Sequence, residues 1–293
     1  MKVLVTGGAG FIGSHIADAL IARGHDVVVL DNFSSGRRAN VPAGVTIVDC
    51  DIATKSFGVE ADVVCHQAAQ PSLRTSIEYP YLDAMVNIIG TLRVMKRAKR
   101  CGAHIVFASS SAVYDPAGGV FAEASPVMPN LPYGIAKAAA EQYLRASGVP
   151  HTILRYGNVY GPRQVPVGEN QLIPHALAHI TTGVPFAING DGQQTRDFVY
   201  VGDIARANVL AIESRVSGTY NCGTGRGVAV NAVCAALREL CDWPGDWQHG
   251  PAKVGEARHV ALASARAADA LGWRAETDLM DGLQQTIQAW GRA

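Results

Sequence analysis

The fold is decided near the start of the chain, where residues 2–15 read KVLVTGGAGFIGSH. An apolar run typical of a strand leads into a cluster of glycines, and apolar residues at helical spacing then continue until Gly24. A second apolar run, over 27–30, ends at Asp31. The order strand, helix, strand within about 30 residues predicts a βαβ unit whose two strands are parallel.

The glycines of this segment match a dinucleotide-binding loop. Gly8, Gly10 and Gly13 satisfy the spacing GxGxxG, and Gly7 with the last two satisfies GxxGxxG. A helix that begins there presents unpaired amides and a partial positive charge, which suit a pyrophosphate. Asp31 follows Gly13 by 18 residues, close to the roughly 20 at which an acid accepts hydrogen bonds from the adenosine ribose. The pattern predicts a bound dinucleotide.

Asp31 also favours NAD over NADP, because a carboxylate repels a 2′-phosphate. The neighbouring Arg37 and Arg38 leave a second interpretation open. They are solvated charges if their loop extends into solvent, and they can pair with a phosphate if the loop folds back. We expect NAD as the cofactor.

The remainder of the first half continues the alternation of strand and helix patterns. Four further strand-like runs occur at 45–48, 61–65, 105–108 and 152–154, and helical patterns lie around 81–100 and 134–146. This alternation predicts an α/β fold with a doubly wound parallel sheet of the Rossmann type.

The pattern changes after about residue 160 to loops rich in glycine and proline. Shorter helical patterns follow near 203–213, 228–240 and 279–290, and a β-like run spans Asp197 to Val201. That run indicates a return to the first domain before the chain leaves it again. We therefore expect an NAD-binding domain over 1–160 with a return segment near 193–215, and a smaller mixed α/β substrate-binding domain over 161–293.

Charge and composition exclude several classes of protein. The chain has 25 Lys and Arg against 25 Asp and Glu, so no net field would hold nucleic acid or an anionic membrane. Its six cysteines form no CxxC pair, which is typical of reduced thiols. No run approaches the roughly 18 apolar residues of a membrane span. We expect a cytoplasmic location and no metal, since His175 and His179 lack the acid of a HExxH site.

Tyr133 and Lys137 are four residues apart at the start of a helical pattern, so they share one helix face. A tyrosine ordinarily has a pKa near ~10, and a nearby ammonium with the positive nicotinamide of oxidised cofactor would lower that pKa toward neutrality. Tyr133 would then be a general base. The three serines at 109–111 follow a predicted strand, at the edge where doubly wound sheets bind ligands.

The chain carries a series of segments that extend these motifs. They are TGGAGFIGSH (6–15), DNFSSGRR (31–38), DCDI (49–52), HQAAQPS (66–72), NIIGT (87–91), SSSAVY (109–114), YGIAK (133–137), RYGNVYGPRQ (155–164) and GDGQQTRDFVYVGDIARA (190–207). Over nearly its whole length the chain thereby resembles the extended short-chain dehydrogenase/reductase family. Within that family it is most similar to the nucleotide-sugar epimerases of the UDP-glucose 4-epimerase type.

The resemblance implies a role for individual residues. Tyr133 would be the catalytic base, Lys137 would hold the nicotinamide ribose, and Ser110 would be the catalytic hydroxyl, with Ser111 as the adjacent alternative. The residues expected to hold NAD are Gly7, Gly10, Phe11, Ile12, Asp31, Asn32, Asp51 and Ile52, with Ala68, Ala69 and Asn87 on the nicotinamide side, beside Tyr133 and Lys137. The residues expected to contact the sugar nucleotide are Ser110, Ser111, Asn158, Leu172, Arg196, Lys253 and Glu256.

The implied reaction is epimerisation at C4 of a nucleotide-diphosphate sugar, with UDP as the expected nucleotide, through a transient 4-keto sugar. Dehydratases and decarboxylases of the same family are the alternative. They share the ketone step but place an acid after the catalytic hydroxyl, where Ser111 and Ala112 stand here. Because alanine cannot move a proton, epimerisation is favoured. A non-catalytic NAD-binding regulator is a further alternative, although such proteins tend to lose the Tyr/Lys pair.

Five positions bear on which substrate binds. Gly157 stands where an aromatic residue is usual in the family, and Asn189 stands where Tyr or Phe often stacks on uracil. Lys253 and Glu256 resemble the family's Arg-Pro-Gly-Asp segment without the bidentate fork of arginine. Val260 lies near a position where, in the family, a bulky residue limits the sugar pocket. A valine there would admit a 2-acetamido sugar.

The helical pattern from Leu82 to Ala98 carries apolar residues on more than one face, and one sheet cannot cover them all. We expect this helix and the one from Tyr133 to form the interface of a two-fold homodimer. The expected partners are therefore a nucleotide sugar and a second copy of the chain, with no nucleic acid and no membrane.

Overall fold

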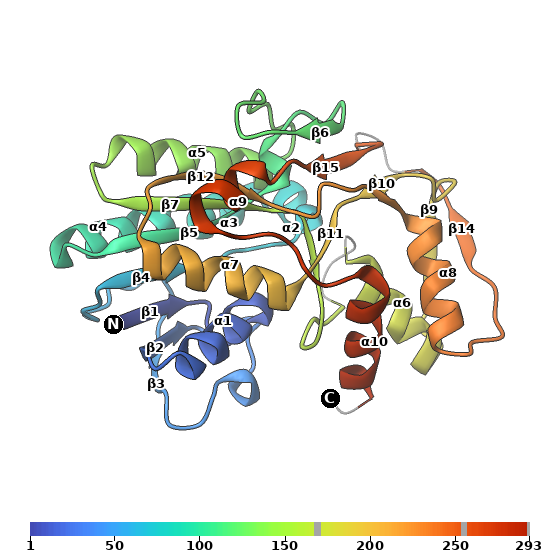
Figure 1. Cartoon of the computed structure of the whole chain (residues 1–293), viewed down its shortest axis with the longest axis horizontal. Helices are drawn as coiled ribbons and strands as arrows, with labels where there is room; N and C mark the ends of the chain where they lie inside the picture. Colours follow the sequence, from blue (N-terminus) through green and yellow to red (C-terminus); the bar gives the residue numbers. More distant parts are fainter. Residues whose placement is uncertain (167–170, 253–256, 292–293) are drawn as a thin grey trace.

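A computed structural model describes residues 1–166, 171–252 and 257–291. Figure 1 shows a larger part built around one sheet and a smaller part that carries the C-terminal helix. The sheet has seven parallel strands in the order β12-β7-β5-β4-β1-β2-β3. The strands are β1 Lys2–Thr6, β2 Asp26–Asp31, β3 Thr46–Asp49, β4 Val63–His66, β5 His104–Ser110, β7 His151–Tyr156 and β12 Gly218–Cys222. The predicted doubly wound Rossmann sheet is confirmed.

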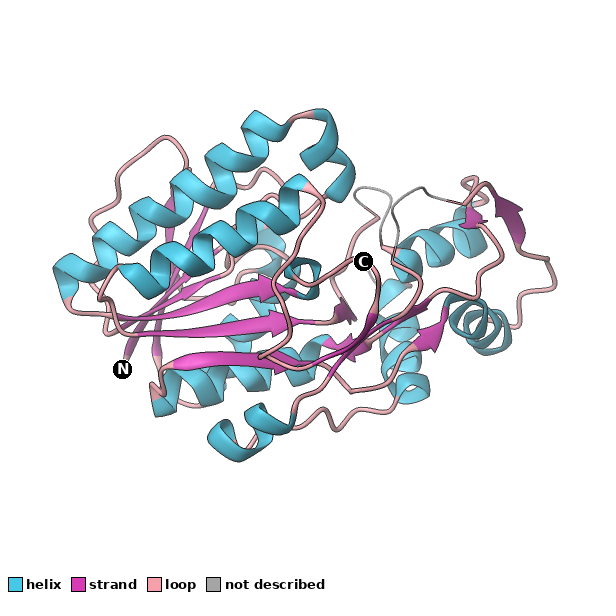
Figure 2. Cartoon of the chain, turned by 90° about the horizontal axis from the view of Figure 1, so that it is seen from above, coloured by secondary structure: helices cyan, strands magenta, loops and turns pink. Residues whose placement is uncertain are grey.

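Helices cover both faces of the sheet, as Figure 2 shows. On one face, α1 (Phe11–Ala22), α7 (Val201–Ser214) and α9 (Ala265–Leu271) bury Ile16, Leu20 and Ile204 against alternate strand residues. On the other face, α4 (Thr91–Cys101) and α5 (Pro132–Ala146) bury Val94 and Leu144 against the intervening strand residues. Because side chains alternate along a strand, one sheet supports both cores.

The predicted helix around 81–100 is built from three joined segments. They are α3 (Pro80–Ala84), a π-helical turn η2 (Met85–Gly90) and α4, and the short helix α2 (Leu73–Glu78) precedes them. At the junction of η2 and α4 the Thr91 hydroxyl donates to the carbonyl of Asn87 at 2.7 Å. The wider turn changes which side chains face α5, and such turns are frequent near functional sites.

The chain returns to the sheet late in the sequence through α7 and β12. The β-like run near 197–201 forms β11 (Phe198–Tyr200), which pairs with β8 (Asn158–Tyr160) instead of joining the large sheet. The strand that does join it, β12, reads GTYNC and follows the expected return segment. The sequence of this strand is not an apolar run. Its polar Asn221 can be buried because the side-chain amide donates tertiary hydrogen bonds.

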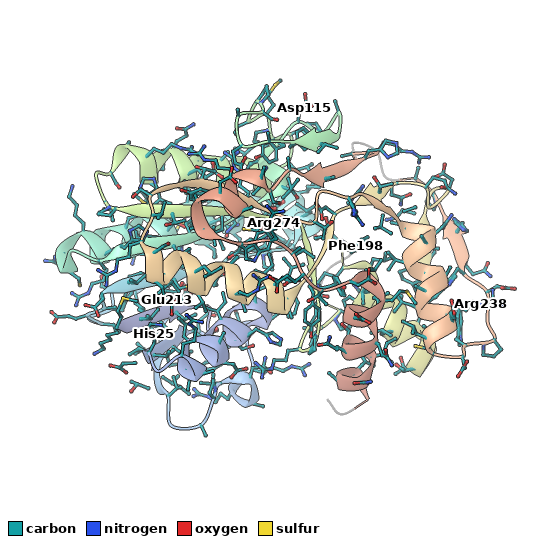
Figure 3. The ribbon with its side chains drawn as sticks, viewed as in Figure 1. His25, Asp115, Phe198, Glu213, Arg238 and Arg274 are labelled. Atoms are coloured by element: carbon teal, nitrogen blue, oxygen red, sulfur yellow. The ribbon has the colours of Figure 1, made fainter. Side chains whose placement is uncertain are left out.

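The smaller part packs helices against short two-stranded pairs. Its core contains Tyr160 and Phe198, and Figure 3 labels Phe198 near the junction of the two parts. The helices are α6 (Leu172–Thr182), α8 (Val230–Leu240) and α10 (Leu279–Trp290), and the strand pairs are β9 (Ala187–Asn189) with β14 (Gln248–Gly250) and β10 (Thr195–Arg196) with β13 (Val228–Ala229). A third pair joins β6 (Gly119–Phe121) to β15 (Val260–Leu262), and 3₁₀ turns η1 (Arg38–Asn40) and η3 (Ser111–Val113) complete the elements.

No helix among the described residues combines the length and the apolar character needed to cross a bilayer. Nor do the described residues bring three His, Cys, Asp or Glu side chains into a metal-binding group.

Candidate active site

One cavity of about 1660 Å³ opens between the C-terminal ends of the sheet strands and the smaller part. Ligands of doubly wound sheets bind at this edge. The volume exceeds the roughly 300–1,000 Å³ of a pocket for one small ligand, so the cavity suits two. The predicted site residues that line it are Gly7, Gly10, Phe11, Ile12, Asp31, Asn32, Asp51, Ile52, Ala68, Ala69, Ser110, Ser111, Tyr133, Lys137, Asn158, Leu172 and Arg196.

The glycine loop forms a cradle that side chains would fill. Gly7 has a φ of +68°, and a Cβ there would lie 2.7 Å from the backbone nitrogen of Ala68. A Cβ on Gly13 would collide with the carbonyl of Gly7. Gly10 caps the N-terminus of α1, and its amide donates to the Gly7 carbonyl at 3.1 Å. The bare backbone and the helix N-terminus together fit a pyrophosphate.

Asp31 lies at the end of β2, where its carboxylate is held in place by backbone amides. Oδ2 accepts from the amide of Ala9 and Oδ1 from that of Phe33, both at 2.9 Å. The loop that follows folds back, since the amide of Arg37 donates to the carbonyl of Ala9 at 3.0 Å. Arg37 lines the cavity, whereas Arg38 pairs with Asp49 at 2.9 Å. The carboxylate beside the loop suits the ribose hydroxyls of NAD.

Asn87 does not line the cavity, although it was expected on the nicotinamide side. Its side-chain amide donates to the carbonyl of Gln70 at 3.0 Å and to the carboxylate of Asp83 at 2.8 Å. Its Oδ1 accepts from the amide of Gln70 at 3.0 Å. Asn87 therefore lies behind the loop that carries Ala68 and Ala69 and supports that loop through these hydrogen bonds.

Tyr133, Ser110 and Lys137 converge where β5 ends and α5 begins. The hydroxyl of Ser110 lies near enough to the phenol of Tyr133 to lower its pKa, and it accepts from the amide of Ala112 at 3.2 Å. The ammonium of Lys137 donates to the carbonyl of Ala108 at 2.9 Å. Ser111 also lines the cavity, so both serines face it, but the effect on the pKa of Tyr133 belongs to Ser110.

The chain's own groups shift the pKa of Tyr133 upward, so the expected lowering depends on the positive charge of the nicotinamide. Burial, with a smaller effect of the Asp83 carboxylate, raises the pKa of Tyr133 to about 12 against the opposing effect of Ser110. Burial lowers the pKa of Lys137 to about 8. The ammonium lies 5.8 Å from the centre of the Tyr133 ring and is turned toward Ala108. The chain's own charges thus leave Tyr133 protonated at neutral pH.

The opposite wall of the cavity comes from the smaller part. It includes Asn158 from β8, Leu172 from α6 and Arg196 from β10. Nη1 of Arg196 donates to the carbonyl of Thr195 at 2.7 Å. The substrate-related positions Gly157, Asn189 and Val260 also line this cavity, whereas Lys253 and Glu256 lie outside the described residues.

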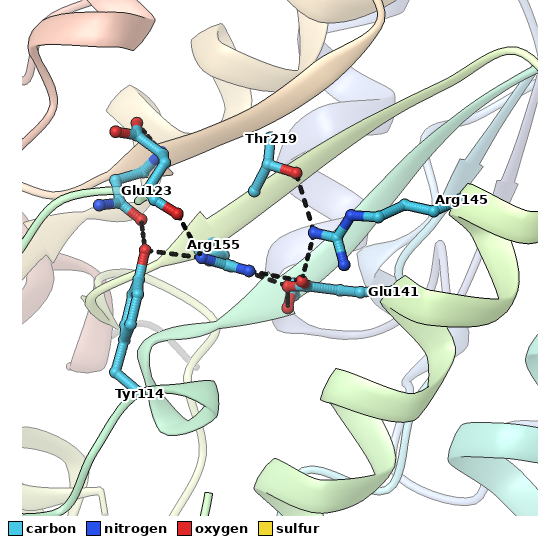
Figure 4. Close-up of polar contacts among 8 residues, drawn as sticks. Tyr114, Glu123, Glu141, Arg145, Arg155 and Thr219 are labelled. Carbon is cyan, nitrogen blue, oxygen red and sulfur yellow. Dashed lines mark hydrogen bonds and ion pairs between the residues drawn. The ribbon is translucent and has the colours of Figure 1, made fainter. Parts of the chain in front are cut away.

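The site also contains buried charges that the motifs did not identify. Asp83, on α3, is 1% exposed and accepts from Asn87 and Gln70. Glu141 and Arg155 form a buried ion pair at 2.6 Å, which Figure 4 shows beside Tyr114. Two sequence signals mark the pair: an arginine inside the apolar strand 152–156, and a glutamate one helical turn after Lys137.

Comparison with known proteins bears on this geometry. The sequence profile described as the NAD dependent epimerase/dehydratase family matches residues 3–223. The UDP-glucose 4-epimerase of Mycolicibacterium smegmatis is 35% identical over 306 residues, which cover 98% of each chain. The structure of the UDP-glucose 4-epimerase of Thermotoga maritima with UDP-glucose has a TM-score of 0.93 at 36% identity, covering 100% of this chain and 99% of that one. The Thermus thermophilus UDP-glucose 4-epimerase in complex with NAD has a TM-score of 0.91 at 38% identity, covering 100% of both.

Proposed function

This chain belongs to the NAD-dependent epimerase/dehydratase family, and we propose that it inverts C4 of a UDP-sugar through a transient 4-keto intermediate. One observation carries the proposal. The cavity that is lined by the glycine cradle is also lined by Tyr133 and Ser110, with Lys137 one helical turn after Tyr133.

We propose that the glycine cradle holds the pyrophosphate of NAD and that Asp31 holds the adenosine ribose. The pyrophosphate would lie at the amides of Gly10, Phe11 and Ile12, and the ribose at Asp31. The two free protons of the Lys137 ammonium, beyond the one given to Ala108, would hold the second ribose. When bound, NAD supplies a carrier for hydride and a positively charged ring close to the phenol.

Tyr133 is the group that moves the substrate proton in this proposal. Its phenol would take the proton of the C4 hydroxyl, while Ser110 holds that hydroxyl in place. Because the chain's own groups raise the pKa of Tyr133, the phenol would need the positive charge of the nicotinamide to act as a base. With the C4 hydride carried by NAD and given back to the opposite face of the carbon, return of the proton to the C4 oxygen by the same phenol would complete the inversion with no net oxidation.

Inversion at C4 also requires the sugar to turn over while the nucleotide stays bound. We propose that Arg196, Asn158 and Leu172 hold the nucleotide diphosphate, together with Lys253 and Glu256. A planar guanidinium can bind phosphate with two parallel hydrogen bonds. Apart from Asn158, which lies just before its start, these residues belong to the smaller domain, which we propose over 161–293. The proposed catalytic residues belong to the NAD-binding domain over 1–160.

The alternative chemistry of the family finds less support in this site. Dehydration or decarboxylation needs an acid after the catalytic hydroxyl, and Ala112 offers only a backbone amide, which donates to Ser110. A regulator without activity would not need Ser110, Tyr133 and Lys137 together at the cavity. Epimerisation is the reaction that the arrangement serves best.

The proposal is tested by incubating the purified protein with NAD and UDP-glucose and identifying the product by NMR. We expect UDP-galactose, and Tyr133→Phe should abolish turnover while NAD binding persists. Tyr143→Phe is the matched control, because Tyr143 lies on the same helix with an exposed side chain. Full activity of Tyr133→Phe, or a 4-keto-6-deoxy product, would refute the proposal.

We also propose that the protein is a homodimer. Large apolar side chains are exposed on α2, α3 and α5 and on the segment between α2 and α3: Ile77, Tyr79, Tyr81, Leu82, Ile135 and Tyr143. These helices pack against one another, and we name their exposed apolar side chains the helical face. Exposed apolar side chains on neighbouring helices favour association, and a two-fold axis would pair the face with itself.

For location we propose the cytoplasm. All six cysteines are free thiols, and Cys50, Cys65, Cys222 and Cys234 are buried. Unpaired cysteines are typical of proteins from reducing compartments. Fractionation of cells that produce the protein tests this proposal, and recovery from an oxidising compartment would contradict it.

A further inference from the structure

A row of polar residues crosses the buried C-terminal edge of the sheet. Ser109 on β5 pairs in register with Arg155 on β7, which pairs with Asn221 on β12. All three are at most 3% exposed. Strands covered on both faces are usually apolar throughout, so a buried polar row indicates a specific requirement.

Glu141 connects this row to the helix that carries Tyr133 and Lys137. Its carboxylate accepts from the Ser109 hydroxyl at 2.6 Å and from Nε and Nη2 of Arg155 at 2.9 and 2.6 Å (Figure 4). Nη2 of Arg145 donates to it at 2.8 Å. Glu141 is fully buried and lies one turn after Lys137, while Ser109 directly precedes Ser110.

The other end of the network reaches the wall of the cavity. Nη1 of Arg155 donates to the Tyr114 hydroxyl at 2.9 Å, and that hydroxyl donates to Asn221 at 2.7 Å. The amide of Asn221 donates in turn to the carbonyl of Phe121 at 2.9 Å. Tyr114 and Phe121 line the cavity, and their rings stack with centres 4.8 Å apart.

Stability alone does not account for such a network. Replacing a buried ion pair by apolar residues is often neutral or stabilising, because both charges lose their hydration. The geometric effect is more specific. Through Ser109 the pair contacts the end of β5, and through Glu141 it contacts the middle of α5, so it links the strand that carries Ser110 to the helix that carries Tyr133.

We propose that Glu141 and Arg155 are positioning residues that hold Ser110, Tyr133 and Lys137 in their reactive arrangement. Neither side chain lines the cavity, so neither touches substrate or cofactor. The proposal rests on the proposed epimerase function and extends it to residues outside the binding surface.

The pair also contributes to the charge balance around Lys137. Asp83 from α3, Glu141 from α5 and His66 from β4 face the ammonium, and His66 is neutral because burial lowers its pKa to about 3. Both carboxylates raise the pKa of Lys137 against the effect of burial. Removing the charge of Glu141 while Arg155 stays positive should therefore lower the pKa of Lys137.

The test compares Glu141→Gln with the double variant Glu141→Gln/Arg155→Met, which removes both charges. For the single variant we expect a kcat on UDP-glucose reduced about tenfold or more, a KM within about threefold, and an alkaline limb of the kcat profile at lower pH. For the double variant we expect the alkaline limb and the melting temperature to return toward wild type while kcat stays low. Circular dichroism and retained NAD establish that each variant is folded.

Several outcomes would overturn the proposal. An unchanged kcat in the single variant shows that the pair positions nothing, and full recovery of kcat in the double variant shows that only the unpaired charge mattered. Glu213→Gln is the control. Glu213 lies on α7, where it pairs with Arg23 at 2.7 Å and lies beside His25 (Figure 3), so its replacement should leave kcat unchanged. Since wild type is measured alongside, failure of the epimerase function itself would be recognised by the absence of any turnover.

Discussion

The proton of Tyr133 is subject to opposing local effects. Burial and the carboxylate of Asp83 stabilise the protonated phenol, and Ser110 stabilises the phenolate. Asp83 is itself almost fully buried, and its pKa is raised by burial and lowered by its bonds with Gln70 and Asn87. A single carboxylate outside the recognised motifs therefore influences when the proposed base becomes active.

Asp83→Asn tests this influence at the scale of one residue. Asparagine keeps an acceptor for Gln70 and Asn87 but removes the charge, so the pKa of Tyr133 should fall. The acid limb of the kcat/KM profile should move to lower pH by about half a unit or more. A pH titration of phenolate absorbance, taken as the difference from Tyr133→Phe in each background, checks the same shift without turnover.

Asp203→Asn is the control for loss of a buried carboxylate elsewhere. Asp203 lies on α7, where it accepts from the amides of Glu276 and Thr277, and it does not line the cavity. We expect its profile to match wild type. An acid limb that stays in place in Asp83→Asn, or moves to higher pH, contradicts the assignment.

At the scale of the element, the position of the start of α1 depends on the absence of side chains at its glycines. The Gly13 position faces the carbonyl of Gly7, so the helix can approach β1 only without a side chain there. That close approach aims the first amides of α1 at the cavity. The same backbone packing thus produces both the βαβ unit and the proposed pyrophosphate site.

Gly13→Ala should damage both properties at once. We expect a loss of about 1–3 kcal/mol in the free energy of unfolding, as for other overpacked sites. We also expect a smaller rise in melting temperature on adding NAD, because that rise depends on affinity. Gly58→Ala is the matched control, since its Cβ would meet open space, and both quantities should stay at their wild-type values. Wild-type stabilisation of Gly13→Ala by NAD would disprove the assigned site.

At the scale of the whole molecule, the helical face raises the question of assembly. Its most exposed member, Tyr81, is 78% exposed, and the face lies on the helices that also pack behind the proposed active site. α2 and α3 contribute Ile77 and Leu82 to the cavity lining as well. Pairing two copies through this face would therefore brace one wall of the cavity.

Sedimentation of the protein at micromolar concentration tests the dimer. We expect wild type to sediment as a dimer and Tyr81→Glu/Tyr143→Glu as a monomer, because burying carboxylates without partners is costly. Val120→Glu, at an equally exposed apolar position on β6 outside the face, should remain dimeric. A monomeric wild type, or a charged double variant that still dimerises, would contradict the proposal.

Local sequence alone determined the Rossmann sheet, because strand periodicity, the glycine loop and Asp31 are encoded within short segments. The Tyr133–Lys137 pair and the family were predictable for the same reason. Only the tertiary structure brought Asp83 to Tyr133 and Arg155 to Glu141, placed Asn87 behind the cavity wall and added β12 to the sheet. These features depend on contacts between distant segments, and burial in those contacts raises the pKa of Tyr133.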